Sequence, residues 1–414
     1  MSKRVVPLAL GLVFSASTVF ASGWRIPEQS VNSTALSAAY VAHTTGADAS
    51  YFNPAAMAWL EDRLQVEGDL TGIRLTTIDY TDSRSATLSG SSEGETFLLP
   101  QIHLVSQKIK QLRFGFSLTY PGGLAKRWQD PYPRRYAEEF SLKVVEANPS
   151  VAYAVNDRVA LAVGVRGLYA DGTVKSYAAN VAGPGTYVSR DLDGDTTELG
   201  YNLALSCRVT DRFRFGATYR SKVDLDLEGN ATLADNVGAP SYNGPARVSV
   251  PQPAVLALGV SYDFGRTTVE LAFDRTYWSA YKNLDFNYNT TFGPGHPFYA
   301  FDASIPKDWS DVNAYRIGIT HRLNDQWTLM AGFAIDNNPV PDKSLGFELP
   351  DSDSRIYSLG CRYRYNEHLD AGLAYLYDDK GDRTVNNTAE GGGVDGHFEG
   401  AAAHLVSLGF TCLF

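Results

Sequence analysis

Apolar and polar residues alternate along most of the chain beyond residue 60. In 112–120 every second residue is apolar, and the residues between them are polar or small. A period of two places successive side chains on opposite faces of a β-strand, so each such stretch predicts a strand with one apolar face. The pattern recurs in six further stretches: 159–169, 201–209, 315–319, 327–335, 357–365 and 369–377. The sequence therefore predicts an all-β protein.

Tight polar turns connect many of these strands. Six of them are evident, at 108–111, 156–158, 210–212, 263–266, 324–326 and 366–367. Six hairpins account for twelve strands, and a first strand near 64–78 and a last one at 404–414 raise the expected number to about fourteen. The other connections are long and rich in Gly, Asp and Asn, as in 178–197, 283–309 and 379–396. Short turns, long loops and an even strand number are typical of a transmembrane antiparallel β-barrel of the outer membrane.

A large soluble β-sandwich is the alternative fold. It would explain the alternation but not the regular sequence of short turns and long loops. The last strand also favours a barrel, because Val406, Leu408, Phe410, Cys412 and Phe414 share one face and the chain ends on an aromatic residue. Aromatic residues near strand ends would form the girdles of such a barrel: Tyr219, Tyr277, Trp278, Trp327 and Tyr377.

The first residues predict a signal peptide at 1–21. Lys3 and Arg4 precede an apolar run over 5–20, and Ala21 follows it as a small residue at a cleavage site. A membrane-spanning anchor is the alternative, but the run is interrupted by polar residues and is shorter than the roughly 20 apolar residues that a bilayer requires. We therefore expect export and a bacterial outer-membrane location.

Charge and candidate chemistry exclude several functions. The formal net charge of -10 falls to -12 without Lys3 and Arg4, which argues against a nucleic-acid partner. Seven scattered histidines show neither metal-ligand spacing nor a companion nucleophile, so we predict no enzyme, no cofactor and no metal site. The stretch "DLDGD" at 191–195 resembles a calcium loop, but position twelve is Asn202 rather than Glu. An acidic extracellular loop is the expected structure, and a loosely held divalent cation there is the alternative. Cys207, Cys361 and Cys412 are too far apart to indicate a disulfide framework.

Several motifs resemble one transporter family. They are "NPAAM", "GLAKRWQDPYPRRYAEE", "NPSVAYAVNDRVALAVGV", "YRSKVDLDLEG", "VPQPAVLALGVSYDF", "DWSDVNAYRIGITHRLNDQWTLMAGFAIDNNPVPD", "LPDSDSRIYSLG" and "AAAHLVSLGFTCLF". In this order they resemble the FadL family of outer-membrane long-chain fatty-acid transporters, which also contains channels for monoaromatic hydrocarbons. The resemblance covers essentially the whole mature chain. It implies a monomeric fourteen-stranded barrel, at 61–414, whose lumen is closed by an N-terminal hatch, at 22–60.

The hatch would consist of short helices and turns. Residues 22–60 are too rich in Ala and Ser for a strand, and Pro54 ends any helix that runs through Asn53. Irregular backbone is tolerated inside a barrel because protein rather than lipid surrounds it. By resemblance, Asn53, Pro54 and Ala55 form the hatch motif, and Trp24 is the aromatic residue that moves with the hatch and gates the inner site. A plain linker before the barrel is the alternative.

The resemblance also implies a lateral opening in the barrel wall. Tyr120, Pro121, Gly122 and Gly123 end the predicted third strand, where proline removes a ladder hydrogen bond and two glycines leave no side chain to fill the wall. In the family this position is an inward kink through which a hydrophobic ligand moves into outer-membrane lipid. An ordinary turn at the end of a strand is the alternative.

Further ligand contacts follow from the same resemblance. Trp128, Tyr132 and Tyr136 lie in a predicted extracellular loop, 122–140, and would form a surface landing site for amphiphiles. Lys307 falls where the family has a basic residue for the ligand carboxylate. A second such residue is expected near Ser176, with Lys175 beside it, and a shift of one residue would move a strand side chain to the other face.

The predicted function is uptake of long-chain fatty acids or similar hydrophobic small molecules. Because Ser176 stands where the family has a second basic residue, a channel for monoaromatic hydrocarbons or alkanes is an alternative. An outer-membrane adhesin or structural protein, which would need no lateral opening, comes from a different functional class. An outer-membrane hydrolase is a third alternative.

Overall fold

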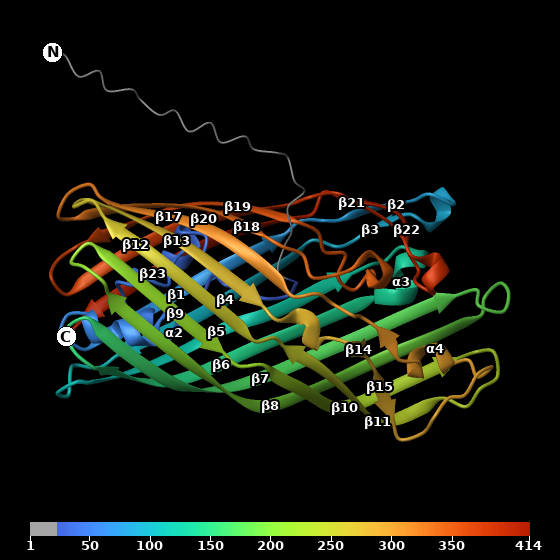
Figure 1. Ribbon diagram of the computed structural model, residues 1–414. Helices are drawn as coiled ribbons and strands as arrows, with labels where there is room; N and C mark the ends of the chain where they lie inside the picture. Colours follow the sequence, from blue (N-terminus) through green and yellow to red (C-terminus); the bar gives the residue numbers. More distant parts are fainter. Residues whose placement is uncertain (1–22) are drawn as a thin grey trace, which may run out of the picture.

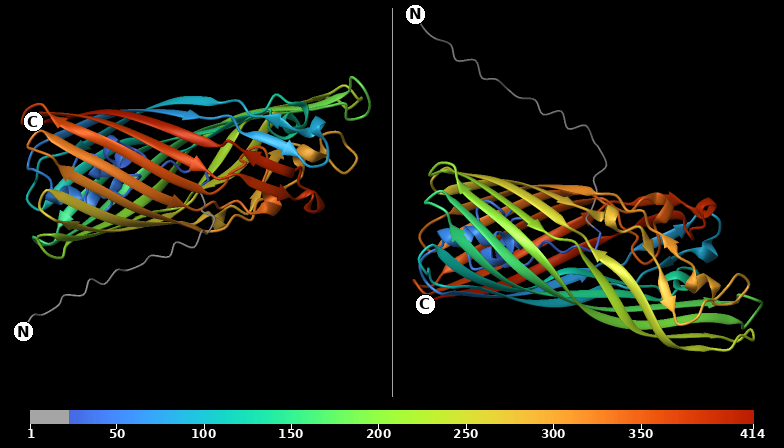
Figure 2. Two further views of the ribbon diagram at one scale, coloured as in Figure 1. Left: turned by 90° about the horizontal axis from the view of Figure 1, so that it is seen from above. Right: turned by 60° about the horizontal axis from the view of Figure 1, so that its bottom comes forward.

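The computed structural model describes residues 23–414, and the predicted signal peptide at 1–21 lies outside them (Figures 1 and 2). Fourteen antiparallel strands form a closed barrel, which confirms the predicted fold and strand number. The barrel closes where β1 pairs with β23, from Gln65 opposite Leu413 to Leu75 opposite Ala403. The strands are β1 (Gln65–Leu75), β4 (Glu95–Val105), β5 (Leu112–Arg127), β6 (Glu139–Ala154), β7 (Val159–Ala179), β8 (Tyr187–Arg208), β9 (Phe213–Arg220) with β10 (Val223–Asp235), β11 (Tyr242–Gln252) with β12 (Val255–Asp263), β13 (Thr267–Thr276), β17 (Val312–Arg322), β18 (Trp327–Asp336), β19 (Ser354–Arg364), β20 (Leu369–Lys380) and β23 (Ala402–Leu413).

Two of the fourteen strands are broken, each into two segments. Ser221 and Lys222 separate β9 from β10, while Pro253 and Ala254 separate β11 from β12. Proline cannot donate to a ladder, which accounts for the second break. Across the breaks, β12 pairs with β9 and β10 pairs with β11, so the wall stays continuous.

The wall is much taller on one side than on the other. β7 and β8 contain 21 and 22 residues, whereas β18 contains 10, and a tilted strand needs only about 9–11 residues to span a bilayer. The long strands project beyond the rest of the barrel at the end opposite the C-terminus (Figure 2, left). The predicted long loop at 178–197 is therefore mostly strand, and "DLDGD" lies within β8 rather than in a loop.

The polarity of the strands reverses along this tall side. In the lower part of β8, Tyr201 and Leu203 face outward and Asn202 is buried inside. In the upper part Leu192 is buried inside, while Asp191 and Asp193 are exposed on the outside. An apolar outer face fits lipid, and a charged outer face fits water. The reversal places the upper boundary of the apolar zone on β7 between Tyr169 and Asp171, both of which face outward.

Short elements cover the tall end of the barrel. There β21 (Arg383–Asn386), β22 (Asp395–Glu399), β2 (Asp79–Asp82) and β3 (Gly90–Ser91) form a small sheet. Helix α3 (Pro131–Ala137) contacts β3, and α4 (Tyr299–Asp302) lies by β15 (Phe286–Tyr288) (Figure 1). A two-stranded sheet of β14 (Asn283–Leu284) and β16 (Ile305–Pro306) lies in the same region, and β15 pairs with β11. Four short 3₁₀ helices complete the connections: η2 (Ala86–Leu88), η3 (Trp278–Ala280), η4 (Asp342–Ser344) and η5 (Thr388–Glu390).

The N-terminal segment, residues 23–60, lies inside the barrel (Figure 1). It contains α1 (Val31–Ala35), α2 (Ala49–Phe52) and the 3₁₀ helix η1 (Pro54–Trp59). Helix α1 packs against β18, β19, β20 and β23, whereas η1 packs against β5, β6, β7 and β8. Glycines on the inner wall permit this contact, since a Cβ at Gly332 would lie 2.2 Å from the carbonyl carbon of Leu36.

Among residues 23–414, no helix combines the length and apolar character that crossing a membrane requires.

Candidate functional site

Strands β4 and β5 are hydrogen-bonded over only four residue pairs. The ladder runs from Ile102 opposite Leu118 to Val105 opposite Gly115, although β4 begins at Glu95 and β5 continues to Arg127. Beyond the ladder β5 shifts register against β6 between Thr119 and Gly122. Pro121 lies in this shift and has no N–H to donate. The two strands therefore diverge, and we call the unpaired stretch of 95–101 and 119–127 the lateral gap.

A loop closes the lateral gap at its upper end. Ser92 forms an isolated bridge with Trp128, and the backbone N–H of Glu93 donates to the carbonyl of Arg127 at 2.8 Å. The gap is thus a bounded opening within one wall rather than a break along the whole strand.

The first described residues of the chain pair with β5 from inside the barrel. The N–H of Gly123 donates to the carbonyl of Trp24 at 3.0 Å, and the N–H of Ile26 donates to the carbonyl of Pro121 at 3.1 Å. The side-chain amide of Gln29 completes the contact, because it donates to the carbonyl of Tyr120 and accepts from its N–H, at 2.8 and 2.7 Å. We call residues 23–29 the N-terminal arm. It brings Trp24 together with Tyr120, Pro121, Gly122 and Gly123.

A cavity of about 470 Å³ connects the lumen with this gap. Its inner lining is largely apolar and includes Ile73, Leu99, Leu376 and Leu405, together with the N-terminal arm. Its lining also includes Leu98, whose side chain is 67% exposed on the outer face of β4. One continuous space therefore reaches from the middle of the barrel to its outer surface.

Charged groups of both signs line the cavity. Lys380 forms an ion pair with Asp351 at 2.6 Å, and Arg127 pairs with Glu95 and Glu139, each at 2.7 Å. Lys126 differs from them. Its side chain is only 5% exposed, and its ammonium donates to the hydroxyl of Ser92 at 3.4 Å without an ion pair to any described carboxylate.

Glu28, in the N-terminal arm, is one of the buried acids that line the cavity. Burial raises the pKa of its carboxyl to about 7, and Arg316 lowers that pKa only in part. One of its carboxylate oxygens has no hydrogen-bond partner in the described structure. The residue therefore titrates near neutral pH at the base of the cavity.

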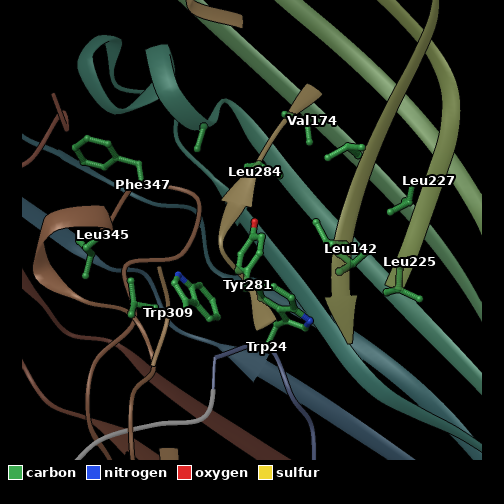
Figure 3. Packing of buried hydrophobic residues seen from close by; sticks show 14 of the residues in the cluster. Trp24, Leu142, Val174, Leu225, Leu227, Tyr281, Leu284, Trp309, Leu345 and Phe347 are labelled. Atoms are coloured by element: carbon green, nitrogen blue, oxygen red, sulfur yellow. The ribbon is translucent and has the colours of Figure 1, made fainter. Parts of the chain in front are cut away.

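Trp24 lies in a compact aromatic cluster (Figure 3). Its ring centroid is 4.4 Å from that of Trp278, 5.3 Å from Tyr281 and 5.0 Å from Trp309. A Cβ on Gly23, which has a positive φ of 65°, would lie 3.0 Å from both Trp278 and Trp309. Trp278 is fully buried, so its prediction as a girdle residue is wrong. The cluster holds the start of the arm beside the cavity.

The two lysines predicted for the ligand carboxylate lie away from this cavity. Lys307 is buried, with 4% exposure, and forms an ion pair with Glu348. Lys175 faces outward, and its ammonium lies 3.6 Å from both Glu139 and Asp191. Neither lysine is among the lining residues.

Position 176 faces the interior, beside a cation that the sequence analysis missed. Ser176 is buried, and Arg190 of β8 donates to its hydroxyl at 3.1 Å. The Arg190 guanidinium also lies 4.4 Å from the ring centroid of Phe286. Finding Arg190 requires the register between β7 and β8, because Arg190 is opposite Ser176 only in the folded sheet.

Asn53, Pro54 and Ala55 fix the N-terminal segment against the opposite side of the barrel. The Asn53 amide donates to the carbonyls of Val41 and Leu205, at 2.8 and 3.2 Å, and its oxygen accepts from the N–H of Ala55. Pro54 begins η1, a position that tolerates a missing N–H.

The predicted landing site is only partly on the surface. Trp128 is fully buried and donates from its indole to the carbonyl of Phe347 at 2.8 Å, so its prediction as a surface residue is wrong. Tyr132 is half-buried and Tyr136 is exposed; their rings lie 5.6 Å apart, and both residues belong to α3, which replaces part of the predicted loop.

One group of described side chains could hold a metal ion. Asp382, His397 and Glu399 lie close together near β21 and β22, and two of the three are exposed. His397 Nδ1 already lies 2.9 Å from the hydroxyl of Thr384.

Comparison with known proteins identifies the family to which this barrel belongs. Residues 12–414 match the model of the outer membrane protein transport protein family (OMPP1/FadL/TodX). The chain belongs to this family. It is 25% identical to a long-chain fatty acid transport protein of Salmonella typhi, over 89% of this chain and 91% of that one. It is 23% identical to outer membrane protein P1 of Haemophilus influenzae, over 89% and 88%.

Solved structures share the fold. A FadL homologue of Pseudomonas aeruginosa superposes with a TM-score of 0.80 and 20% identity, covering 94% of this chain and 99% of that one. The P. putida toluene transporter TodX gives a TM-score of 0.72 and 20% identity, covering 93% and 98%. Membership in the family makes this protein an outer-membrane transporter of hydrophobic compounds and not an enzyme.

Proposed function

We propose that this protein takes up long-chain fatty acids, or similarly hydrophobic compounds, and releases them sideways into the bilayer through the lateral gap. The observation that supports this function best is the continuous cavity that begins at the N-terminal arm and ends at the exposed Leu98. Its volume, about 470 Å³, falls within the range of roughly 300–1,000 Å³ that is usual for ligand sites. A lateral exit would keep an apolar tail out of water, where each exposed Å² costs roughly 25 cal/mol.

Several residues would have roles in this route. The N-terminal arm occupies the inner side of the gap, so release would require the Trp24 end of the arm to move. Asn53, Pro54 and Ala55 would keep the rest of the N-terminal segment in place as the hatch. Tyr136 and Tyr132 would provide the first contact for an amphiphile at the outer end. The working unit would be a monomer, because one barrel contains the complete route.

Lys126 is the best-placed group for a ligand carboxylate. It is a buried cation in the cavity wall and lacks an ion pair among the described residues. A buried cation without an ion pair is unfavourable, and an incoming carboxylate would relieve that cost. Lys307 stays a prediction for the same role, although its ion pair with Glu348 would have to break first.

A channel for monoaromatic hydrocarbons is the second candidate. The aromatic cluster of Trp24, Trp278, Tyr281 and Trp309 borders the cavity through Trp24, and it would suit a flat apolar ligand. The acids Glu28, Asp351 and Asp378 also line the cavity and would oppose a carboxylate. The toluene transporters among the structural relatives have the same fold.

Uptake by cells that lack their own transporter tests the proposal. Cells that express the intact chain receive labelled oleate or labelled toluene, and the variant Leu98→Trp places a bulky ring at the outer mouth of the gap. We expect uptake to fall at least about fivefold in this variant. Leu359→Trp is the matched control, because Leu359 is similarly exposed on the outer face of β19, at 62%, but does not line the cavity.

The pattern of results distinguishes the candidates. Loss of oleate uptake in Lys126→Gln, with uptake unchanged in Lys307→Ala, would establish a fatty-acid channel in which Lys126 binds the ligand carboxylate. Toluene uptake that is indifferent to both lysines would favour a hydrocarbon channel. Equal uptake by Leu98→Trp and Leu359→Trp would overturn lateral release, and no uptake by the intact chain would favour a surface role.

A further inference from the structure

A second lysine lies at the outer mouth of the lateral gap. Lys143 of β6 is exposed on the outer face and lines the same cavity whose inner wall contains Lys126. In the ladder Lys143 is directly opposite Gly123, while Lys126 is three residues further along β5. At about 3.3 Å per residue, the two positions are roughly 10 Å apart along the strand. Their side chains leave the wall on opposite faces, because Lys126 is buried inside.

The Lys143 side chain is directed toward the gap. Its ammonium lies 5.8 Å from the ring centroid of Tyr120, one of the residues at the kink of β5. Asp171 of β7 is opposite Lys143 in the neighbouring ladder and also lines the cavity. Even so, Lys143 forms no ion pair with any carboxylate in residues 23–414. It is therefore a cation at the exit that is available to a ligand.

The depth of Lys143 matches the polar boundary of the barrel. Below it on β6 the outward residues are Val145, Ala147 and Pro149, and above it they are Ser141 and Glu139. On β7 the same change occurs between Tyr169 and Asp171. A ligand whose carboxylate is held at Lys143 would have its tail against the apolar part of the wall. This is the orientation that a fatty acid adopts in a leaflet, with its head at the level of the polar groups.

We propose that Lys143 is the exit residue for carboxylate ligands: it receives the head group of a departing fatty acid on the outer face of the wall, after Lys126 has held it on the inner face. This inference rests on the proposed function and adds a specificity determinant to it. A neutral ligand would use the same gap without needing Lys143. The exit would thus favour acids over hydrocarbons of equal length.

The experiment compares two ligands of equal length and different charge. Cells without their own transporter express the full chain or a variant, and uptake of labelled oleate and labelled oleyl alcohol is measured at equal surface levels of folded barrel. We expect Lys143→Gln to lower oleate uptake about two- to fivefold, which is the range that one exposed ion pair accounts for. Lys143→Glu should lower it further, and Lys143→Arg should restore it. Uptake of oleyl alcohol should stay within twofold in all three variants.

Lys175→Gln is the matched control. Lys175 also faces outward on the tall side of the wall, but it is paired with Glu139 and Asp191 and does not line the cavity. Unchanged oleate uptake in Lys143→Glu, or an equal loss in Lys175→Gln, would overturn the assignment. A parallel loss of oleyl alcohol uptake would do so too, because it would mean that Lys143 only shapes the opening. Failure of the intact chain to take up either ligand would refute the proposed function itself, and this inference with it.

Discussion

Single side chains attach the N-terminal segment to the barrel wall. Arg113 of β5 is almost completely buried and donates to the backbone carbonyls of Met57, Leu60, Glu61 and Arg63. Glu270 of β13 accepts from three consecutive N–H groups, those of Val41, Ala42 and His43. These residues satisfy irregular backbone that neither helix nor sheet would satisfy. Nothing in the sequence marks them, because these partners are 50 or more residues away.

Replacement of Arg113 should therefore loosen the end of the N-terminal segment. Arg113→Met keeps most of the side-chain volume but leaves several buried carbonyls without a donor, and each such group costs roughly 1–3 kcal/mol. We expect the free energy of unfolding to fall by about 3 kcal/mol or more, measured by urea titration in detergent. Arg158→Met serves as the comparison, because Arg158 is exposed in a turn and donates to one carbonyl. Equal stability of the two variants would contradict this role of Arg113.

Glu28 gives the N-terminal arm a pH dependence of known sign. Burial raises its pKa to about 7, so the folded state retains a proton that the unfolded state loses from about pH 4.5 upward. Its contribution to stability therefore declines as pH rises from about 4.5 to 7 and stays low above 7. Glu28→Gln, which never ionises, should match the natural protein at pH 5 and unfold at a higher temperature at pH 8. His43, whose pKa burial lowers to about 4, and Asp48, raised to about 7, are unchanged in both proteins and cancel in this comparison.

Equal unfolding temperatures of the two proteins at pH 8 would show that Glu28 is not an unfavourable buried acid.

At the scale of the element, the sequence predicts a strand best where one face of the strand contacts lipid and the other is polar. The alternation in 112–120 and 201–209 identified β5 and β8, because lipid demands an apolar face. The upper part of β8 also alternates, but with Leu192 inside and Asp191 and Asp193 outside. The sequence analysis predicts an acidic loop here because it expects apolar residues on the outer face of a strand. The kink of β5 could be expected from Pro121 and the two glycines, whereas the pairing of Trp24 with Gly123 could not, since no local pattern specifies it.

The glycines that face α1 should be intolerant of side chains. A Cβ at Gly332 of β18 would lie 2.2 Å from the Leu36 carbonyl carbon, so Gly332→Val must displace the end of α1 from the wall. We expect the barrel to form but the N-terminal segment to become sensitive to protease, as judged by cleavage within 30–45 in the folded protein. Gly68→Val in β1 is the control, because its Cβ would meet no atom within 4 Å. Protection that is equal in both variants would show that the segment can adapt its position.

At the scale of the whole molecule, the uneven wall and the reversed polarity of β7, β8 and β10 define an orientation. Asp171, Asp195 and Glu228 lie side by side on the outer face of these strands, with Asp195 opposite each of the other two in the ladders. Like charges in such a row repel one another and are tolerated only in water. The tall end must therefore stand outside the bilayer, and the tight turns, such as 210–212, must lie at the other side of the membrane.

Cysteine labelling in intact cells checks this orientation. Asp195→Cys should react with a membrane-impermeant maleimide on whole cells, whereas Asp211→Cys, in a tight turn, should react only after the outer membrane is permeabilised. The natural Cys207, Cys361 and Cys412 are half-buried in the wall, so the unmodified protein provides the background for both measurements. Labelling of Asp211→Cys on intact cells would reverse the orientation. The upper end of the lateral gap, where Ser92 and Trp128 close it, would then lie on the inner side of the outer membrane.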